Sequence, residues 1–313
     1  MYSVLCSFCS TTAFYRREYE GVNLCKRCFK RSIEDKVRFT VSKYKMFSPK
    51  DHIAVAVSGG KDSQALLQIL NKLKIRFPLS KLTAVTIDEG IRGYREEALS
   101  LAGAFSESLK IEHKIFSFKE LFQVTLDEIV QRQSKMSPCS YCGVLRRRAI
   151  EKAARAVGAD VIATAHNIDD EVQTILLNIL HGGAERLART GPVLRDPSMR
   201  FIPRVKPLCE IYEREIALYT YISGLAFQSV PCPYRNRALR NDIRDALDML
   251  EKKHPGLKHT AYSSKMRLSN LLGDRDVKLN CCRICGEWTG RDLCGVCRIT
   301  IEHGEIECLS REA

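Results

Sequence analysis

Apolar positions along this chain follow two alternating periodicities. Continuous apolar runs rich in β-branched residues indicate strands buried on both faces of a sheet, and they occupy residues 53–57, 82–87 and 161–165. Between them, apolar residues recur at helical spacing, first over 64–73 and again over about 95–109, with a further strand expected near 111–116. This alternation predicts an α/β fold built on an open, doubly wound parallel sheet.

The turn after the first strand carries candidate chemistry, and its sequence is Ser58-Gly59-Gly60-Lys61-Asp62-Ser63. Two glycines let the backbone approach a ligand, and the N-terminus of the following helix offers unpaired N–H groups to an anion. The turn is not a kinase-type P-loop, because that loop needs an earlier glycine and Asp62 separates Lys61 from Ser63. We therefore expect a phosphate site of another kind, with an ordinary Gly-Gly turn as the alternative.

Composition narrows the partners and the compartment. The 313 residues include 50 Lys and Arg against 37 Asp and Glu, a net charge of +13, which favours a polyanion partner, nucleic acid ahead of an anionic membrane. The sequence has no long apolar span and no signal-peptide pattern at Met1, so a cytoplasmic protein is expected. Its 14 cysteines lie largely in C-x-x-C pairs, which in a reducing compartment indicates metal binding in place of disulfides.

Four closely spaced cysteines near each end of the chain form two zinc patterns. Two C-x-x-C pairs place four thiolates around one ion and leave no open position for catalysis; free thiols are the alternative. Cys281 is a neighbour that could replace the first ligand of the second pattern. The two sets are Cys6, Cys9, Cys25 and Cys28, and Cys282, Cys285, Cys294 and Cys297.

A basic segment follows the first zinc pattern. Residues 26–50 hold nine basic and two acidic side chains, with Ile33, Val37, Val41 and Tyr44 at helical spacing. This pattern predicts a basic amphipathic helix, which either presents a solvated face or contacts RNA phosphates. We divide the chain into an N-terminal zinc module (1–30), a basic linker helix (31–50), a catalytic domain (51–225), a helical extension (226–275) and a C-terminal zinc ribbon (276–313).

A third group of cysteines has a different pattern. Cys139-x-x-Cys142 cannot close a zinc site alone, and the nearest unpaired candidate downstream is Cys232, between two prolines. Three thiolates could hold an iron–sulfur cluster with one iron lacking a protein ligand, or two could perform disulfide and persulfide chemistry. Cys232 could also be an inert buried side chain. The arginines around Cys232 favour RNA phosphate contacts or a solvated surface, namely Arg235, Arg237, Arg240 and Arg244.

Residues at the carboxyl ends of the predicted strands should converge on one ligand. Ile87 ends the second strand, and Ala165 and His166 follow the strand at 161–165. Asp170 lies in the first turn of the next helix, where acidic residues are common caps. Beside a triphosphate, however, Asp170 could hold Mg²⁺ or assist the chemical step.

In this order, the motifs resemble the tRNA 2-thiouridine synthetases of the TtuA type and the related cytoplasmic tRNA 2-thiolation proteins, within the PP-loop ATP pyrophosphatase superfamily. The resemblance covers nearly the whole chain. It rests on residues 58–63, Asp88 to Arg95, Cys139 to Arg147, His166 to Glu171, Cys232-Pro233-Tyr234 and both zinc patterns.

The resemblance implies a sulfur-for-oxygen exchange at C2 of a tRNA uridine. ATP would adenylate the uridine oxygen, with Lys61 and the loop amides on the departing pyrophosphate and Mg²⁺ near Asp62 and Asp170, and sulfide would then expel AMP. Cys139, Cys142 and Cys232 correspond to the ligands of a 4Fe-4S cluster. A homodimer is also implied, with sulfide or a ubiquitin-like thiocarboxylate carrier as sulfur donor. The implied nucleotide contacts are Ala56, Val57, Ser58, Gly59, Gly60, Lys61, Asp62, Ser63, Ile87, Arg146, Ala165 and Asp170.

The chain departs from the family pattern at Ala165, where glycine is common, and at Arg146, where some relatives have lysine. Two other functions are possible on the same residues. One is another PP-loop tRNA modifier, such as a cytidine thiolase using persulfide chemistry, and the other is a non-catalytic zinc-ribbon RNA-binding protein. The paired zinc patterns and the three further cysteines disfavour the first, and the intact Lys61 and Asp62 disfavour the second.

Overall fold

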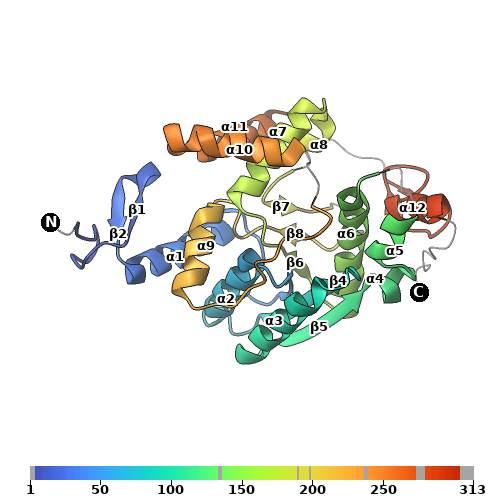
Figure 1. Ribbon diagram of the computed structural model, residues 1–313, viewed down its shortest axis with the longest axis horizontal. Helices are drawn as coiled ribbons and strands as arrows, with labels where there is room; N and C mark the ends of the chain where they lie inside the picture. Colours follow the sequence, from blue (N-terminus) through green and yellow to red (C-terminus); the bar gives the residue numbers. More distant parts are fainter. Residues whose placement is uncertain are drawn as a thin grey trace.

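A computed structural model describes residues 4–132, 136–188, 190–196, 199–235, 239–272 and 279–303. Arg237 and Cys308 lie outside these ranges. A six-stranded sheet forms the centre of the molecule, and the two terminal cysteine modules lie at opposite ends of its long axis (Figure 1). No helix within the described ranges is long and apolar enough to cross a membrane.

The central sheet has the predicted α/β architecture. Its strands are ordered β5 (Glu112–Ser117), β4 (Lys81–Asp88), β3 (His52–Ala56), β6 (Val161–Ala163), β8 (Arg204–Val205) and β7 (Val193–Leu194). From β5 through β4, β3 and β6 to β8, neighbouring strands are parallel, as predicted, whereas the short edge strand β7 pairs antiparallel with β8. Strands of two residues are too short to show a period in the sequence, so this edge left no signal.

Helices cover both faces of the sheet and extend beyond it. Helix α6 begins at Pro138, so Cys139 and Cys142 lie within its first turns and not before it. Proline is well suited to this position because its missing N–H would be unpaired there anyway. The helices are α2 (Lys61–Lys74), α3 (Arg95–Ser108), α4 (Phe118–Phe122), α5 (Leu126–Gln131), α6 (Pro138–Ala156), α7 (Ile168–Leu180), α8 (Ala184–Ala188), α9 (Glu213–Ile222), α10 (Leu239–Lys253) and α11 (Leu257–Leu272).

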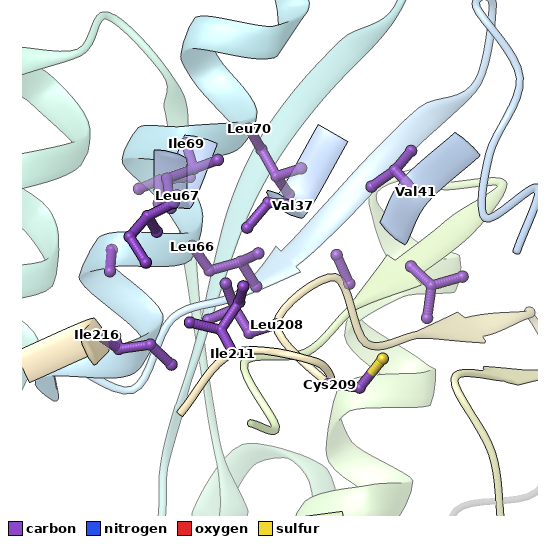
Figure 2. Close-up of a cluster of buried hydrophobic side chains, with 14 of the residues drawn as sticks. Val37, Val41, Leu66, Leu67, Ile69, Leu70, Leu208, Cys209, Ile211 and Ile216 are labelled. Carbon is purple, nitrogen blue, oxygen red and sulfur yellow. The ribbon is translucent and has the colours of Figure 1, made fainter. Parts of the chain in front are cut away.

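The basic helix is shorter than the sequence predicted and contributes to the core. Helix α1 (Lys26–Lys43) ends before residue 50, and Lys45 just beyond it has a positive φ of 48°. Val37 and Val41 of α1 pack beside Leu66 and Leu70 of α2 (Figure 2). Burial of this apolar stripe fixes α1 against the sheet domain, so only its opposite face is free to meet solvent or RNA.

Each terminal module is attached to the sheet domain by buried side chains. The N-terminal module contains β1 (Tyr15–Arg17), the 3₁₀ helix η1 (Glu18–Glu20) and β2 (Val22–Leu24), and Arg17 Nε pairs with Glu215 Oε1 of α9 at 2.6 Å. The C-terminal module contains β9 (Asn280–Cys281), β10 (Trp288–Thr289) and α12 (Gly295–His303). A Cβ at Gly295 would lie 2.8 Å from Val144 Cγ1 of α6, so glycine permits the close approach of these helices.

Candidate active site and metal centres

The turn from β3 into α2 has the geometry of an anion site. Gly59 has a φ of 83°, and a Cβ there would lie 2.5 Å from the Ala98 carbonyl oxygen, so only glycine fits. The Ser63 hydroxyl accepts from the Ser58 amide at 3.1 Å and donates to the Gly60 carbonyl at 2.9 Å, which fixes the turn. Gly60 is the N-cap of α2 and makes no side-chain cap, so the first N–H groups of the helix point beyond it.

A cavity of about 290 Å³ opens beside this turn, at the carboxyl ends of the strands. Its volume is close to the lower end of small-molecule sites. Ten of the predicted nucleotide contacts line it, namely Ala56, Val57, Ser58, Gly60, Asp62, Ser63, Ile87, Arg146, Ala165 and Asp170. Gly59 and Lys61 are not among the lining residues. Seven further lining residues are not among the predicted nucleotide contacts, namely Val85, Glu89, Arg95, Ile150, Thr164, His166 and Arg240.

Lys61 and Asp62 form a partly satisfied charged group at the start of α2. Lys61 Nζ lies 3.0 Å from Asp62 Oδ2 and 2.7 Å from Glu213 Oε1. Burial opposes the charge of Lys61, but the two carboxylates outweigh it and raise its pKa. Burial raises the pKa of Asp62 to about 6, against the effect of Lys61. Asp62 Oδ1 is buried and has no hydrogen-bond partner among the described residues. A carboxylate with an unpartnered oxygen, on a residue that lines a cavity, is suited to a divalent cation.

Asp170 caps a helix and also lines the cavity. Its amide donates to Asn167 Oδ1 at 3.0 Å and its carboxylate accepts from the Asn167 amide at 3.3 Å, a capping box at the start of α7. It also lines the cavity, and burial raises its pKa. His166 and Arg240 line the same wall, and enclosure by the protein lowers the pKa of His166 to about 4, so its ring is neutral at physiological pH.

A charged chain that the sequence did not predict connects the turn to the cysteines of α6. Glu89 is buried, and its carboxylate lies 2.7 Å from Arg95 Nε and 2.7 Å from Arg146 Nε. Arg95 Nη1 donates to the Ser58 carbonyl at 3.1 Å, and Arg146 Nη2 donates to Cys142 Sγ at 2.9 Å. The sequence signal that could have identified Glu89 was an acidic residue just beyond the end of a predicted buried strand.

Cys139 and Cys142 lie in the first turns of α6, and the turn that carries Cys232 packs against them; these residues are here called the three-cysteine set. Cys139 Sγ lies 3.5 Å from the Tyr234 carbonyl oxygen, which joins α6 to the turn carrying Cys232. Cys142 and Cys232 belong to one apolar cluster, in which Cys142 is buried and Cys232 half-buried. The anionic charge of an iron–sulfur cluster would be stabilised by the N-terminus of α6 and by Arg146. These residues fit such a cluster with one iron free of a protein ligand.

The terminal cysteines form two closed sites. Among the described residues, the sulfur atoms of Cys6, Cys9, Cys25 and Cys28 lie within 4.8 Å of one another, and so do those of Cys282, Cys285, Cys294 and Cys297. A zinc ion at about 2.3 Å from each sulfur would separate the sulfurs by about 3.8 Å, so both sets fit a single tetrahedral ion. Cys281 is exposed in β9 and lies outside the second set.

Three comparisons with known proteins agree with one another. A family model described as a PP-loop domain matches residues 30–250. The tRNA 2-thiolation protein NcsA of Haloferax volcanii is 35% identical over 94% of this chain and 97% of its own length. Cytoplasmic tRNA 2-thiolation protein 1 of Drosophila mojavensis is 36% identical over 92% of this chain and 84% of its own. The structure of the U34-tRNA thiolase NcsA from Methanococcus maripaludis, which contains a 4Fe-4S cluster, matches 99% of this chain and 100% of that chain with a TM-score of 0.86 and 34% identity.

Proposed function

This chain belongs to the tRNA 2-thiolation proteins of the PP-loop family, and on that premise we propose that it replaces the C2 oxygen of a tRNA uridine by sulfur. The observation that carries the proposal is the position of the three-cysteine set. Arg146 touches Cys142 and also lines the cavity beside the PP-loop turn. Activation of the oxygen and delivery of sulfur can therefore take place next to each other.

The first half of the reaction is an adenylation. The uridine O2 attacks the α-phosphorus of ATP, a bond to pyrophosphate breaks, and the uridine becomes an adenylated intermediate. The N-terminus of α2 lies where it can bind the phosphates, and Asp62, with Asp170 nearby, would hold Mg²⁺. Lys61 exchanges Glu213 for a phosphate oxygen as the nucleotide binds, and so stabilises the departing pyrophosphate.

The second half replaces AMP by sulfur. Sulfide attacks C2, the C–O bond breaks, and AMP leaves with the former uridine oxygen. A 4Fe-4S cluster bound by Cys139, Cys142 and Cys232 would supply an iron that carries the sulfide. Arg146 provides a hydrogen bond to the sulfur of Cys142, and Glu89 holds the Arg146 guanidinium in place. Apolar side chains around Cys142 limit the access of water.

The remaining assignments follow from the relatives and the composition. The wobble uridine is the proposed target, because the matching solved structure is that of a U34-tRNA thiolase. We assign one zinc ion to each terminal four-cysteine site and a cytoplasmic location. A homodimeric assembly is proposed from the family resemblance alone. Sulfide, free or released from a thiocarboxylate carrier, is the proposed sulfur donor.

Anaerobic purification followed by iron and sulfide analysis tests the cluster, and a thiolation assay on unmodified tRNA with ATP and sulfide tests the activity. We expect about four iron and four sulfide atoms per chain and ATP-dependent thiolation of U34. Cys139→Ala should lose both the iron and the activity. A Cys139→Ala protein with unchanged iron content and unchanged thiolation would refute the cluster mechanism.

Asp62→Ala tests the adenylation half separately. This variant removes the carboxylate assigned to Mg²⁺, so the release of AMP should fall to background while tRNA affinity stays within about twofold. The product of the first half can be followed with radiolabelled ATP and thin-layer chromatography. Normal AMP release together with lost tRNA binding would show that the assigned roles are wrong.

A further inference from the structure

A second cavity lies on the other side of α6, against the C-terminal module. Its volume is about 200 Å³, and its walls come from α6, from β8 and from β10. Arg147 and Glu151 of α6, Arg204 of β8 and Trp288 of β10 line it. Arg146 and Arg147 are adjacent on α6, yet Arg146 lines the first cavity and Arg147 the second.

The two acidic residues in the walls already have partners. Glu151 is buried and accepts hydrogen bonds from Arg204 Nη2 at 3.2 Å and from the Ile202 amide at 2.9 Å, and it also pairs with Arg155. Glu287 pairs with Arg148. Each carboxylate is therefore neutralised by a cation of its own.

Arg147 is a basic residue of this cavity that takes part in none of these ion pairs. Among the described residues it forms no ion pair, and its charged neighbours include Arg204 and Arg146. Partial desolvation lowers the pKa of Arg147, and repulsion from these two guanidinium groups is the second cause. The group nevertheless stays charged at neutral pH. An anion placed here would relieve that repulsion.

Trp288 adds an aromatic surface to the same cavity. It is the single tryptophan of the chain and is half-buried at the edge of β10. The Arg200 guanidinium lies 4.9 Å from its ring centroid and is itself paired with Asp196. A basic side chain and an aromatic ring around one small cavity are the combination that proteins use to bind a phosphate and the adjoining base.

We propose that this second cavity binds the backbone of the tRNA substrate, with a phosphate on Arg147 and Arg204 and a neighbouring base against Trp288. The inference rests on the proposed function, because it takes tRNA as the substrate. Helix α6 connects the second cavity to the proposed reaction, because the same helix carries Arg147 and also Cys139 and Cys142. An RNA strand held at the second cavity would bring its neighbouring nucleotides toward the first cavity.

Fluorescence anisotropy of labelled unmodified tRNA, measured at several KCl concentrations, tests the proposal. Arg147→Gln should weaken binding about tenfold, since a hydrogen bond to a charged group is lost. It should also reduce the salt slope of log K by about 1, as expected for one phosphate contact. Trp288→Leu should weaken binding roughly fivefold or more without changing the slope. Neither variant should alter the affinity for ATP.

Arg283→Gln is the matched control. Arg283 belongs to the C-terminal module that carries Trp288, and its substitution removes the same charge as Arg147→Gln. It is exposed, pairs with Asp292 and does not line the cavity. Its tRNA affinity should stay within about twofold of wild type, apart from a small general electrostatic effect. The thermal midpoint and zinc content of each variant show whether the module is folded. If Trp288→Leu unfolds the module, the salt series of Arg147→Gln alone decides whether the second cavity binds tRNA.

The outcomes separate this inference from the proposed function. If wild-type protein thiolates tRNA and Arg147→Gln binds tRNA with unchanged affinity and slope, the second cavity is not a tRNA site. The inference also fails if Arg147→Gln weakens the binding of ATP as much as the binding of tRNA. If the predicted binding effects appear but the wild-type protein does not thiolate tRNA, the proposed function is wrong and the binding site stands.

Discussion

The terminal four-cysteine sites and the three-cysteine set use the same ligand in opposite ways. In the C-terminal site all four cysteines are buried, and Cys285 Sγ lies 3.7 Å from Cys294 Sγ, the spacing of sulfurs around one ion. In the three-cysteine set Cys139 is exposed, and the set joins two distant segments, namely the start of α6 and the turn that carries Cys232. Four ligands saturate an ion and stabilise a fold, whereas the three ligands that we propose for a cluster would leave a coordination position for chemistry.

Cys142→Ser should separate the two roles most clearly. The substitution removes a proposed cluster ligand, so thiolation should fall to background, while the zinc content of the terminal sites should stay unchanged. Thiolated tRNA can be measured by its retarded migration in a mercury-containing gel, and zinc by elemental analysis. A variant that lost zinc together with thiolation would show that the three-cysteine set is structural after all.

Cys294→Ser should have its main effect on stability. A structural zinc site contributes directly to folding, so loss of one ligand should lower the free energy of unfolding on the order of 5 kcal/mol and release about one zinc ion per chain. Because Cys294 shares a cluster of buried side chains with Tyr141 and Leu145 of α6, the loss should also loosen α6. Chemical denaturation followed by circular dichroism measures the effect, and a chelator should reproduce it in the wild-type protein. An unchanged unfolding curve would mean that this site holds no structural metal.

Glu89→Gln tests the charged chain that links the PP-loop turn to the three-cysteine set. Removal of one partner from a buried ion pair typically costs about 3 kcal/mol, because the remaining charge stays buried. We expect that loss of stability, a thiolation rate about tenfold lower, and a shifted reduction potential of the bound cluster. Glu97→Gln, an exposed change of the same charge on α3, is the control and should change none of the three. A Glu89→Gln protein with a wild-type cluster potential would show that the chain does not act on the cluster.

Cys281→Ser should have the smallest effect. Cys281 is exposed and lies outside the four sulfurs of the C-terminal site, so stability should change by less than about 0.5 kcal/mol and zinc content should not change. Denaturation curves and elemental analysis check both quantities. Loss of zinc here would mean that Cys281, and not Cys282, is the ligand.

The sequence was most informative where the chain is locally constrained. The PP-loop turn, the strand before it and the helix after it were predicted because six consecutive residues define them. The edge strands β7 and β8 were not predicted, because two residues have no readable period and their pairing depends on distant segments. The basic helix was predicted too long, because charged residues continue beyond Lys43 although the backbone turns at Lys45.

The sequence by itself indicated the cysteine groups of both terminal sites, since a few residues between paired cysteines leave little freedom in where the sulfurs lie. The choice of Cys282 over Cys281 came from the structure. The sequence also determined the residue types around the PP-loop turn. Only the tertiary structure decided that Glu89 joins Arg95 to Arg146, that Glu213 pairs with Lys61, and that Arg147 faces a second cavity. These contacts join residues whose separation in sequence carries no periodic or spacing signal, so packing of the sheet and its helices determines them.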